Sequence, residues 1–225
     1  MAIASKKLEW WRLMFKINTI PKYASSVFEG EGLATRRDVD WWIDLFIIDM
    51  IIRPLVKKEK FDEWRLHRRW AQDESGHICS LLVKCSPGMA KKLVRAIEQS
   101  KYFKILKKSK TFFRDFDCLI QPPNADEFPD EITACWPIFM QGVSTFFLAY
   151  IEELHKKLKD QKVEKPTTAS TLVGYRSYYK EMNGYLGSHW HWYGCHAFFH
   201  HINAIFGYEH LQVQFREYTG MVGNV

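Results

Sequence analysis

The amino-acid sequence predicts an α+β fold, in which a small antiparallel sheet (a hairpin plus a strand–helix–strand unit) packs against a mainly helical C-terminal half. Three short segments alternate between apolar and polar residues, which is the period of a β-strand. After a proline-rich loop at residues 121–130, the period becomes helical. Hydrophobic residues make up 47% of the chain and charged residues 26%, as is usual for a soluble globular protein. We therefore expect one domain over residues 1–225.

The N-terminal segment, residues 1–60, is expected to be helical. Within it, residues 6–17 have apolar Leu8, Trp11 and Phe15 at spacings of three and four, with charged residues between them. This spacing is typical of one face of a short amphipathic helix.

A second helix is expected over residues 38–52, which are apolar on most sides. Thr35 or Asp38 would cap its beginning, because short polar side chains accept hydrogen bonds from the first free N–H groups of a helix. Pro54 would help to end it, because proline has no N–H to donate.

The middle third, residues 61–121, predicts a compact α+β unit. Residues 63–70 and 77–85 are expected to be strands, and the turn-like sequence between them joins them as an antiparallel hairpin. A helix is expected over 87–99, since proline suits a first turn. Residues 111–120 alternate again and predict a third strand.

The C-terminal region, residues 129–225, is expected to be helical. A long helix is predicted over 130–159, and two further helices near 171–186 and 188–206 are expected to be separated by glycines. The alternating tail predicts a final strand over 208–218.

Six of the nine histidines lie between Ser188 and His210, among many aromatic residues. His196 and His200 are four residues apart and would share a helix face, a spacing that suits a metal site or acid–base chemistry. The alternative is that they are structural histidines, because the pattern HExxH is absent. His201 is expected to point elsewhere on the helix. Candidates for a third ligand are Glu209, His210, His155, Glu152 and Glu153.

A second candidate site lies on the first predicted hairpin strand. Arg65, His67 and Arg69 occupy alternate positions and would lie on one sheet face, about 7 Å apart. They are candidates for binding a phosphate or carboxylate, which arginine grips with two hydrogen bonds. The alternative is ion pairing with Asp115 and Asp117 of the third strand.

A run of basic residues follows the hairpin, with little opposing acid. Such a run is compatible with nucleic acid or an anionic membrane surface, and equally with a solvated helix face. Its residues are Lys91, Lys92, Arg95, Lys101, Lys104, Lys107 and Lys108.

Residues 132–151 contain no charge over twenty positions, which is the length of a bilayer span. The segment nevertheless contains Gln141, Gly142 and Ser144, so we expect a buried helix and not a transmembrane one. Pro137 would suit the first turn of that helix.

The five cysteines form no CxxC pair, which suits a reducing compartment and predicts a cytoplasmic protein. No phosphate-binding loop or complete catalytic motif occurs. We interpret the chain as a binding or adaptor subunit of a cytosolic multiprotein assembly, because aromatic residues, at 16%, are common at interfaces. The alternative is an enzyme that uses the histidine-rich segment, with the arginines as an anion anchor.

Overall fold

The computed structural model describes residues 7–19, 25–26, 37–38, 41–69, 77–110, 112–123, 128–167 and 170–205. The strands are β1 (Glu9–Thr19), β2 (Ser25–Ser26), β3 (Arg37–Asp38), β4 (Trp64–Arg69), β5 (Ile78–Cys85) and β6 (Phe113–Gln121). The α-helices are α1 (Trp42–Ile47), α2 (Arg53–Glu59), α3 (Pro87–Gln99), α4 (Lys101–Lys108), α5 (Asp130–Asp160), α6 (Leu172–Gly194) and α7 (His201–Ile205); η2 (Ile48–Ile52) and η3 (Cys195–His200) are π-helices.

The chain divides into two compact units, residues 1–183 and 184–225, and each is described by itself. Helix α6 begins in the first unit and continues into the second. The expectation of a single domain over the whole chain stays a prediction.

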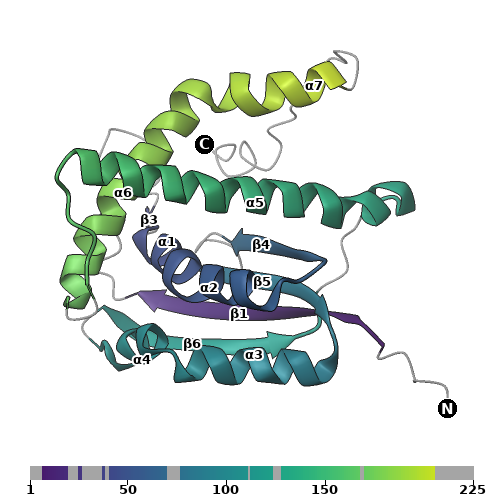
Figure 1. The fold of residues 1–225 in the computed structure, drawn as a ribbon, viewed down its shortest axis with the longest axis horizontal. Helices are drawn as coiled ribbons and strands as arrows, with labels where there is room; N and C mark the ends of the chain where they lie inside the picture. The colour runs from purple at the N-terminus through teal and green to yellow at the C-terminus, as the bar shows by residue number, and fades with distance from the viewer. Residues whose placement is uncertain are drawn as a thin grey trace, which may run out of the picture. The chain divides into compact units, whose positions relative to one another are not determined.

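The first unit contains a four-stranded antiparallel sheet in the order β4-β5-β1-β6 (Figure 1). Helices α1 and α2 connect β1 to β4, and α3 and α4 connect β5 to β6. This order and pairing are those of the split β-α-β arrangement. The α+β class, the β4–β5 hairpin and the strand–helix–strand unit predicted from the sequence are confirmed. The topology by itself indicates no function.

The expected N-terminal helix at residues 6–17 is wrong: this segment is β1, a central strand of the sheet. Leu13, Phe15 and Ile17 alternate on the face that packs under the helices, and all three are buried. Met14 is buried on the opposite face, so the alternation of apolar and polar residues that marks a half-exposed strand is obscured.

Aromatic rings fill the space between the sheet and its helices. Phe116 of β6 lies 6.3 Å from Phe15 and 5.5 Å from Phe103 of α4, measured between ring centroids. Phe46 of α1 meets Tyr102 edge to face at 5.9 Å. Part of the aromatic excess noted in the sequence is therefore core packing.

The expected helix over 38–52 begins later and runs further. It starts at Trp42, and Trp41 occupies the cap position without a side-chain hydrogen bond, so the expected cap by Asp38 is wrong; Thr35 lies outside the described residues. Pro54 does not end it either; it lies in the first turn of α2, directly after the π-helix η2. The wider π-helical turn accommodates a residue that has no N–H to donate. The helix ends at Lys60, which has a left-handed backbone (φ 49°).

The long helix α5 runs along the outer edge of β4 (Figure 1). Gln141 Oε1 accepts a hydrogen bond from Trp64 N–H (3.0 Å), and Ser144 Oγ accepts one from Leu66 N–H (2.9 Å). Gln141 Nε2 also donates to the carbonyl of Asp62. Two outward N–H groups of an edge strand are thus satisfied by helix side chains.

Replacing Ser144 with alanine should lower the free energy of unfolding by about 1–3 kcal/mol, because it leaves the N–H of Leu66 without its acceptor in a buried position. Urea denaturation measures this change. Thr145→Ala is the matched control, since the Thr145 hydroxyl is exposed and bonds only its own helix. Equal effects of the two substitutions would contradict this role of Ser144.

The sequence prediction for α5 is correct in extent, but Pro137 lies inside the helix and not in its first turn. The expected break between two later helices is wrong, because α6 runs unbroken past Gly184 and Gly187. A glycine costs only about 1 kcal/mol in a helix interior, far less than a proline. The predicted strand over 208–218 lies outside the described residues.

Candidate functional site

The basic face predicted on β4 is present in part. Arg65 and His67 lie on the sheet face turned away from the helices. The side chain of Arg69 is not among those that the structure describes. A further basic residue of this face, which no sequence pattern indicated, is Arg12 of β1, which is 5% exposed. Arg12 donates to Ser80 Oγ (3.0 Å) and to His67 Nδ1 (3.3 Å). Arg12 and His67 are therefore already engaged with the sheet itself.

The alternative pairing of this basic face with β6 does not occur among the described contacts. β6 and β4 form opposite edges of the sheet, with two strands between them. Neighbouring strands lie about 4.8 Å apart, so the two edges are too distant for an ion pair. Asp117 pairs with Lys107 instead, at 3.3 Å.

The basic run lies on α3 and α4, and its side chains are exposed. Two of its lysines are paired with acids: Lys92 with Glu59 and Lys107 with Asp117. Binding of nucleic acid or an anionic membrane by this surface stays a prediction.

Three exposed histidines cluster in the second unit, with His196 and His200 in the π-helix η3 and His201 at the start of α7. The His196 and His200 rings are 5.2 Å apart between centroids, so the predicted pair does meet. His201 also lies 5.2 Å from His196 and 5.6 Å from His200, against the expectation that it points elsewhere. Glu209 lies outside the described residues. Within the described residues, no group of three or more histidine, cysteine, aspartate or glutamate side chains could hold a metal ion.

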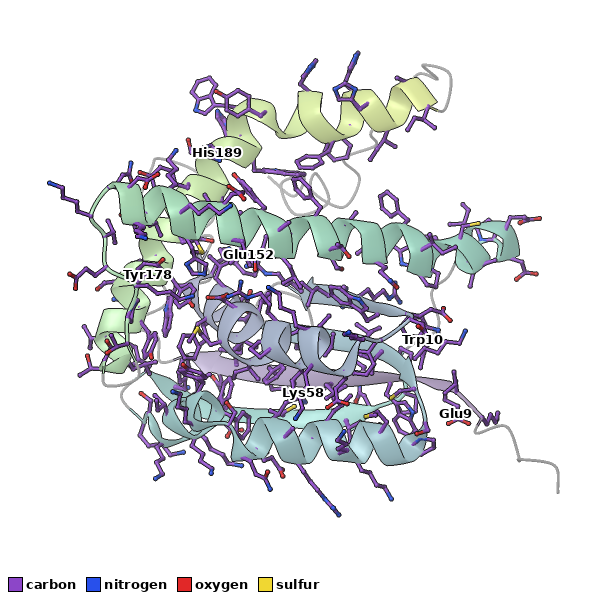
Figure 2. All side chains as sticks on the ribbon, viewed as in Figure 1. Glu9, Trp10, Lys58, Glu152, Tyr178 and His189 are labelled. Atoms are coloured by element: carbon purple, nitrogen blue, oxygen red, sulfur yellow. The ribbon has the colours of Figure 1, made fainter. Side chains whose placement is uncertain are left out.

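A buried carboxylate, Asp49, organises a polar network in the first unit. His155 Nε2 donates to Asp49 Oδ2 (2.8 Å), and the Tyr179 hydroxyl donates to the same oxygen (2.6 Å). Arg53 Nη2 lies 2.5 Å from Oδ1 in an ion pair without hydrogen-bond geometry. The hydroxyl of Tyr178, labelled in Figure 2, forms a hydrogen bond with His155 Nδ1 (2.7 Å). The network therefore joins η2, α2, α5 and α6.

Neighbouring cationic and hydrogen-bonding groups keep the carboxyl group of Asp49 ionised. Burial alone would raise the pKa of its carboxyl, but the hydrogen bond from His155 and the positive charges of His155 and Lys165 outweigh burial and lower the pKa to about 2. Burial, together with the negative charge of Asp49, raises the pKa of Tyr178 to about 12. Asp49 is thus held as a carboxylate and Tyr178 as a neutral phenol, which suits a fixed structural link better than proton transfer at neutral pH.

A second buried carboxylate, Asp44, lies one turn earlier in the helix. His77 Nε2 donates to its Oδ1 and Arg68 Nε to its Oδ2, both at 2.9 Å. Burial would raise the pKa of Asp44, but the charges of Arg68 and His77 lower it on balance. The sequence did carry a signal for both sites: an aspartate inside an apolar run must find a partner when it is buried.

The outer face of α5 carries a row of apolar residues spaced by four and three. These are Ile132, Trp136, Phe139, Val143, Phe146 and Tyr150. Phe139, Val143 and Phe146 are 45%, 44% and 50% exposed. The rings of Trp136 and Phe139 stack at 5.5 Å. We call this row the α5 stripe.

The expectation that residues 132–151 form a buried helix is wrong. Among the described residues α5 is long and apolar enough to cross a membrane, and only 11% of its apolar stretch is buried. Length and composition alone are weak evidence for a membrane span. What the described residues do show is a set of exposed large apolar side chains on α5, a feature typical of contact sites.

No protein-family model, curated protein sequence or solved structure matches this chain.

Proposed function

We propose that the protein is a binding subunit of a cytosolic protein assembly, and that it docks a helix of a partner protein on the α5 stripe. The observation that carries this proposal is the row of apolar residues spaced by four and three from Ile132 to Tyr150. Its exposed members are Ile132, Phe139, Val143 and Phe146, and Trp136 and Tyr150 are partly exposed. That spacing keeps one row of side chains facing a partner helix along its whole length. The stripe is about 27 Å long at 1.5 Å per residue.

The chemistry of the stripe supports a protein partner. Trp136, Phe139, Phe146 and Tyr150 supply large rigid rings, and aromatic residues carry much of the binding energy at protein interfaces. The backbone N–H groups of an α-helix are largely used within the helix, so a partner strand could not add to this surface. A partner helix presenting its own apolar face fits it best.

The opposite side of α5 supports docking over membrane crossing. Leu148, Ile151 and Leu154 are buried there. Glu152, labelled in Figure 2, pairs with Arg53 (2.9 Å) and Lys57. Ser144 holds the edge of the sheet. A bilayer span would have to release these contacts or draw β4 into the lipid, where unpaired backbone groups cost several kcal/mol each.

Photo-crosslinking in the producing cells tests the proposal. With p-benzoylphenylalanine in place of Val143, we expect one discrete adduct with a second protein. Phe139→Glu should abolish that adduct by placing a charge in the seam, while Thr145→Glu, exposed on the same helix but off the stripe, should preserve it.

Both glutamate variants should stay within about 0.5 kcal/mol of the wild type in unfolding free energy, since they change exposed positions. Absence of an adduct, an adduct with lipid, or an adduct only with a second copy of this chain would each contradict the proposal. Alkaline carbonate should release any of the protein that sediments with membranes. Retention of the protein in the lipid fraction would favour a membrane span instead.

A further inference from the structure

The part of α6 that belongs to the second unit has two contrasting halves. Successive residues of an α-helix turn by about 100°, so each position from 184 to 194 can be placed around the helix axis. The large side chains fall within one sector of about 160°, which we call the α6 aromatic sector. It contains Tyr185, Leu186, His189 (labelled in Figure 2), Trp190, Trp192 and Tyr193. The other half holds small or polar residues, which are Gly184, Gly187, Ser188, His191 and Gly194.

The α6 aromatic sector is open to solvent. Trp190, Trp192 and Tyr193 are 56%, 72% and 63% exposed. The Trp190 ring stacks on Phe198 at 5.6 Å between centroids, so the aromatic surface continues into η3. The glycines of the opposite half weaken the helix, and an amphipathic helix gains most of its stability from the surface that its apolar face contacts. The composition of the sector therefore indicates which surface that is.

We propose that the α6 aromatic sector binds the surface of a phospholipid bilayer, with this part of α6 lying in the plane of the lipid headgroups. An interfacial helix buries its apolar face at the boundary between headgroups and acyl chains and leaves its polar face in water. Tryptophan, tyrosine and histidine each combine an apolar ring with a polar tip, which suits a zone that is apolar on one side and wet on the other. The proposal is independent of the α5 stripe.

The charge and width of the sector favour a lipid surface over a partner helix. The sequence from Met182 to Tyr208 contains no aspartate, glutamate, lysine or arginine. Paired helices use flanking charges to select partner and register, and this segment has none to offer. A sector of about 160° is also broader than the seam between two paired helices. The segment contains five histidines, which oppose a bilayer-crossing orientation because polar side chains are costly in the hydrocarbon.

Flotation of the full chain with vesicles of phosphatidylcholine, a lipid without net charge, tests the proposal. We expect the protein to float with the vesicles equally well in about 0.1 M and about 1 M sodium chloride, because salt screens charges and this contact has none. Trp192→Ala should weaken partitioning by at least roughly tenfold, because the indole ring buries a large apolar area at the lipid surface. Tyr193→Ala, a second substitution in the sector, should also weaken it.

The matched control is His191→Ala, which removes an exposed ring from the opposite half of the same helix and should leave partitioning unchanged. Ile138→Glu places a charge at a 75% exposed position of α5 and should also leave it unchanged. Far-ultraviolet circular dichroism confirms that each variant keeps its helices.

Absence of binding to the vesicles, binding that is lost at high salt, or equal weakening by either control would overturn the proposal. A dimer that Trp192→Ala dissociates in sedimentation, without any vesicle binding, would overturn it in favour of a contact between two copies of this chain.

Discussion

Replacing Asp49 with alanine is expected to lower the free energy of unfolding by about 3–5 kcal/mol. The substitution removes the carboxylate that Arg53 and Lys165 pair with and that the hydrogen-bonding groups of His155 and Tyr179 contact. A loss of this size is expected because Asp49 is an acceptor of buried hydrogen bonds and the buried partner of a charge pair, and Tyr179 and His155 cannot replace it with water. Urea denaturation monitored by tryptophan fluorescence measures the loss as a lower midpoint at unchanged slope.

Glu152→Ala is the matched control for this prediction. Glu152 shares Arg53 with Asp49, but its side chain is 43% exposed, so its ion pairs should contribute no more than about 1 kcal/mol. If both substitutions cost the same, the position of Asp49 inside the protein is not the source of the effect. If neither has a measurable cost, the network does not hold α5 and α6 to η2.

Replacing Asp44 with alanine is expected to cost a similar amount, about 3–5 kcal/mol, by the same physical argument. Asp44 and His77 are 0% and 4% exposed in their side chains, so water cannot replace the lost carboxylate. A double-mutant cycle with His77→Ala should show a coupling energy of about 0.5–3 kcal/mol. Asp117→Ala, which removes a 46% exposed carboxylate from a surface pair, is the control.

Lowering the pH should remove the stabilising effect of Asp44 and Asp49 in the unmodified protein, because it protonates their carboxylates. Their pKa values are lower in the folded chain than in the unfolded one, so their stabilisation is complete above about pH 4 and is lost as the pH falls. For Asp49 the loss extends to about pH 2 and amounts to about 2 kcal/mol. The difference in urea midpoint between the wild type and Asp49→Ala should therefore become smaller from pH 6 to pH 4 and smaller again at pH 2.5. Parallel curves would contradict the low pKa.

The elements with one dominant local signal were predictable from the sequence. The hairpin, β6, α3 and α5 each combine a clear period with a recognisable boundary, such as Pro87 in the first turn of α3 after the cap Ser86. β1 was not predictable, because Trp11 and Phe15 fit a helical spacing and Met14 is buried on the second sheet face. A central strand with two buried faces loses the alternation on which recognition depends.

The site residues were harder to predict, since their partners come from distant parts of the chain. Asp49 meets residues 106 and 130 positions later, His155 and Tyr179, and no local motif encodes such a contact. The place of His201 beside His196 depends on a π-helical turn that the sequence pattern did not reveal. The sequence did identify the pair His196 and His200, because spacing by four brings side chains together within one turn.

The seam between α5 and β4 also has a consequence for polymerisation. An edge strand with bare N–H groups recruits strands from other molecules, and this is how sheets grow into fibrils. Gln141 and Ser144 occupy two of those groups on β4. If α5 detached, the unpaired N–H groups of β4 and the apolar surface of α5 would become exposed at the same time. Helix α5, the proposed docking surface, therefore also protects the edge of the sheet. A partner bound to α5 in the folded protein would stabilise this arrangement by mass action.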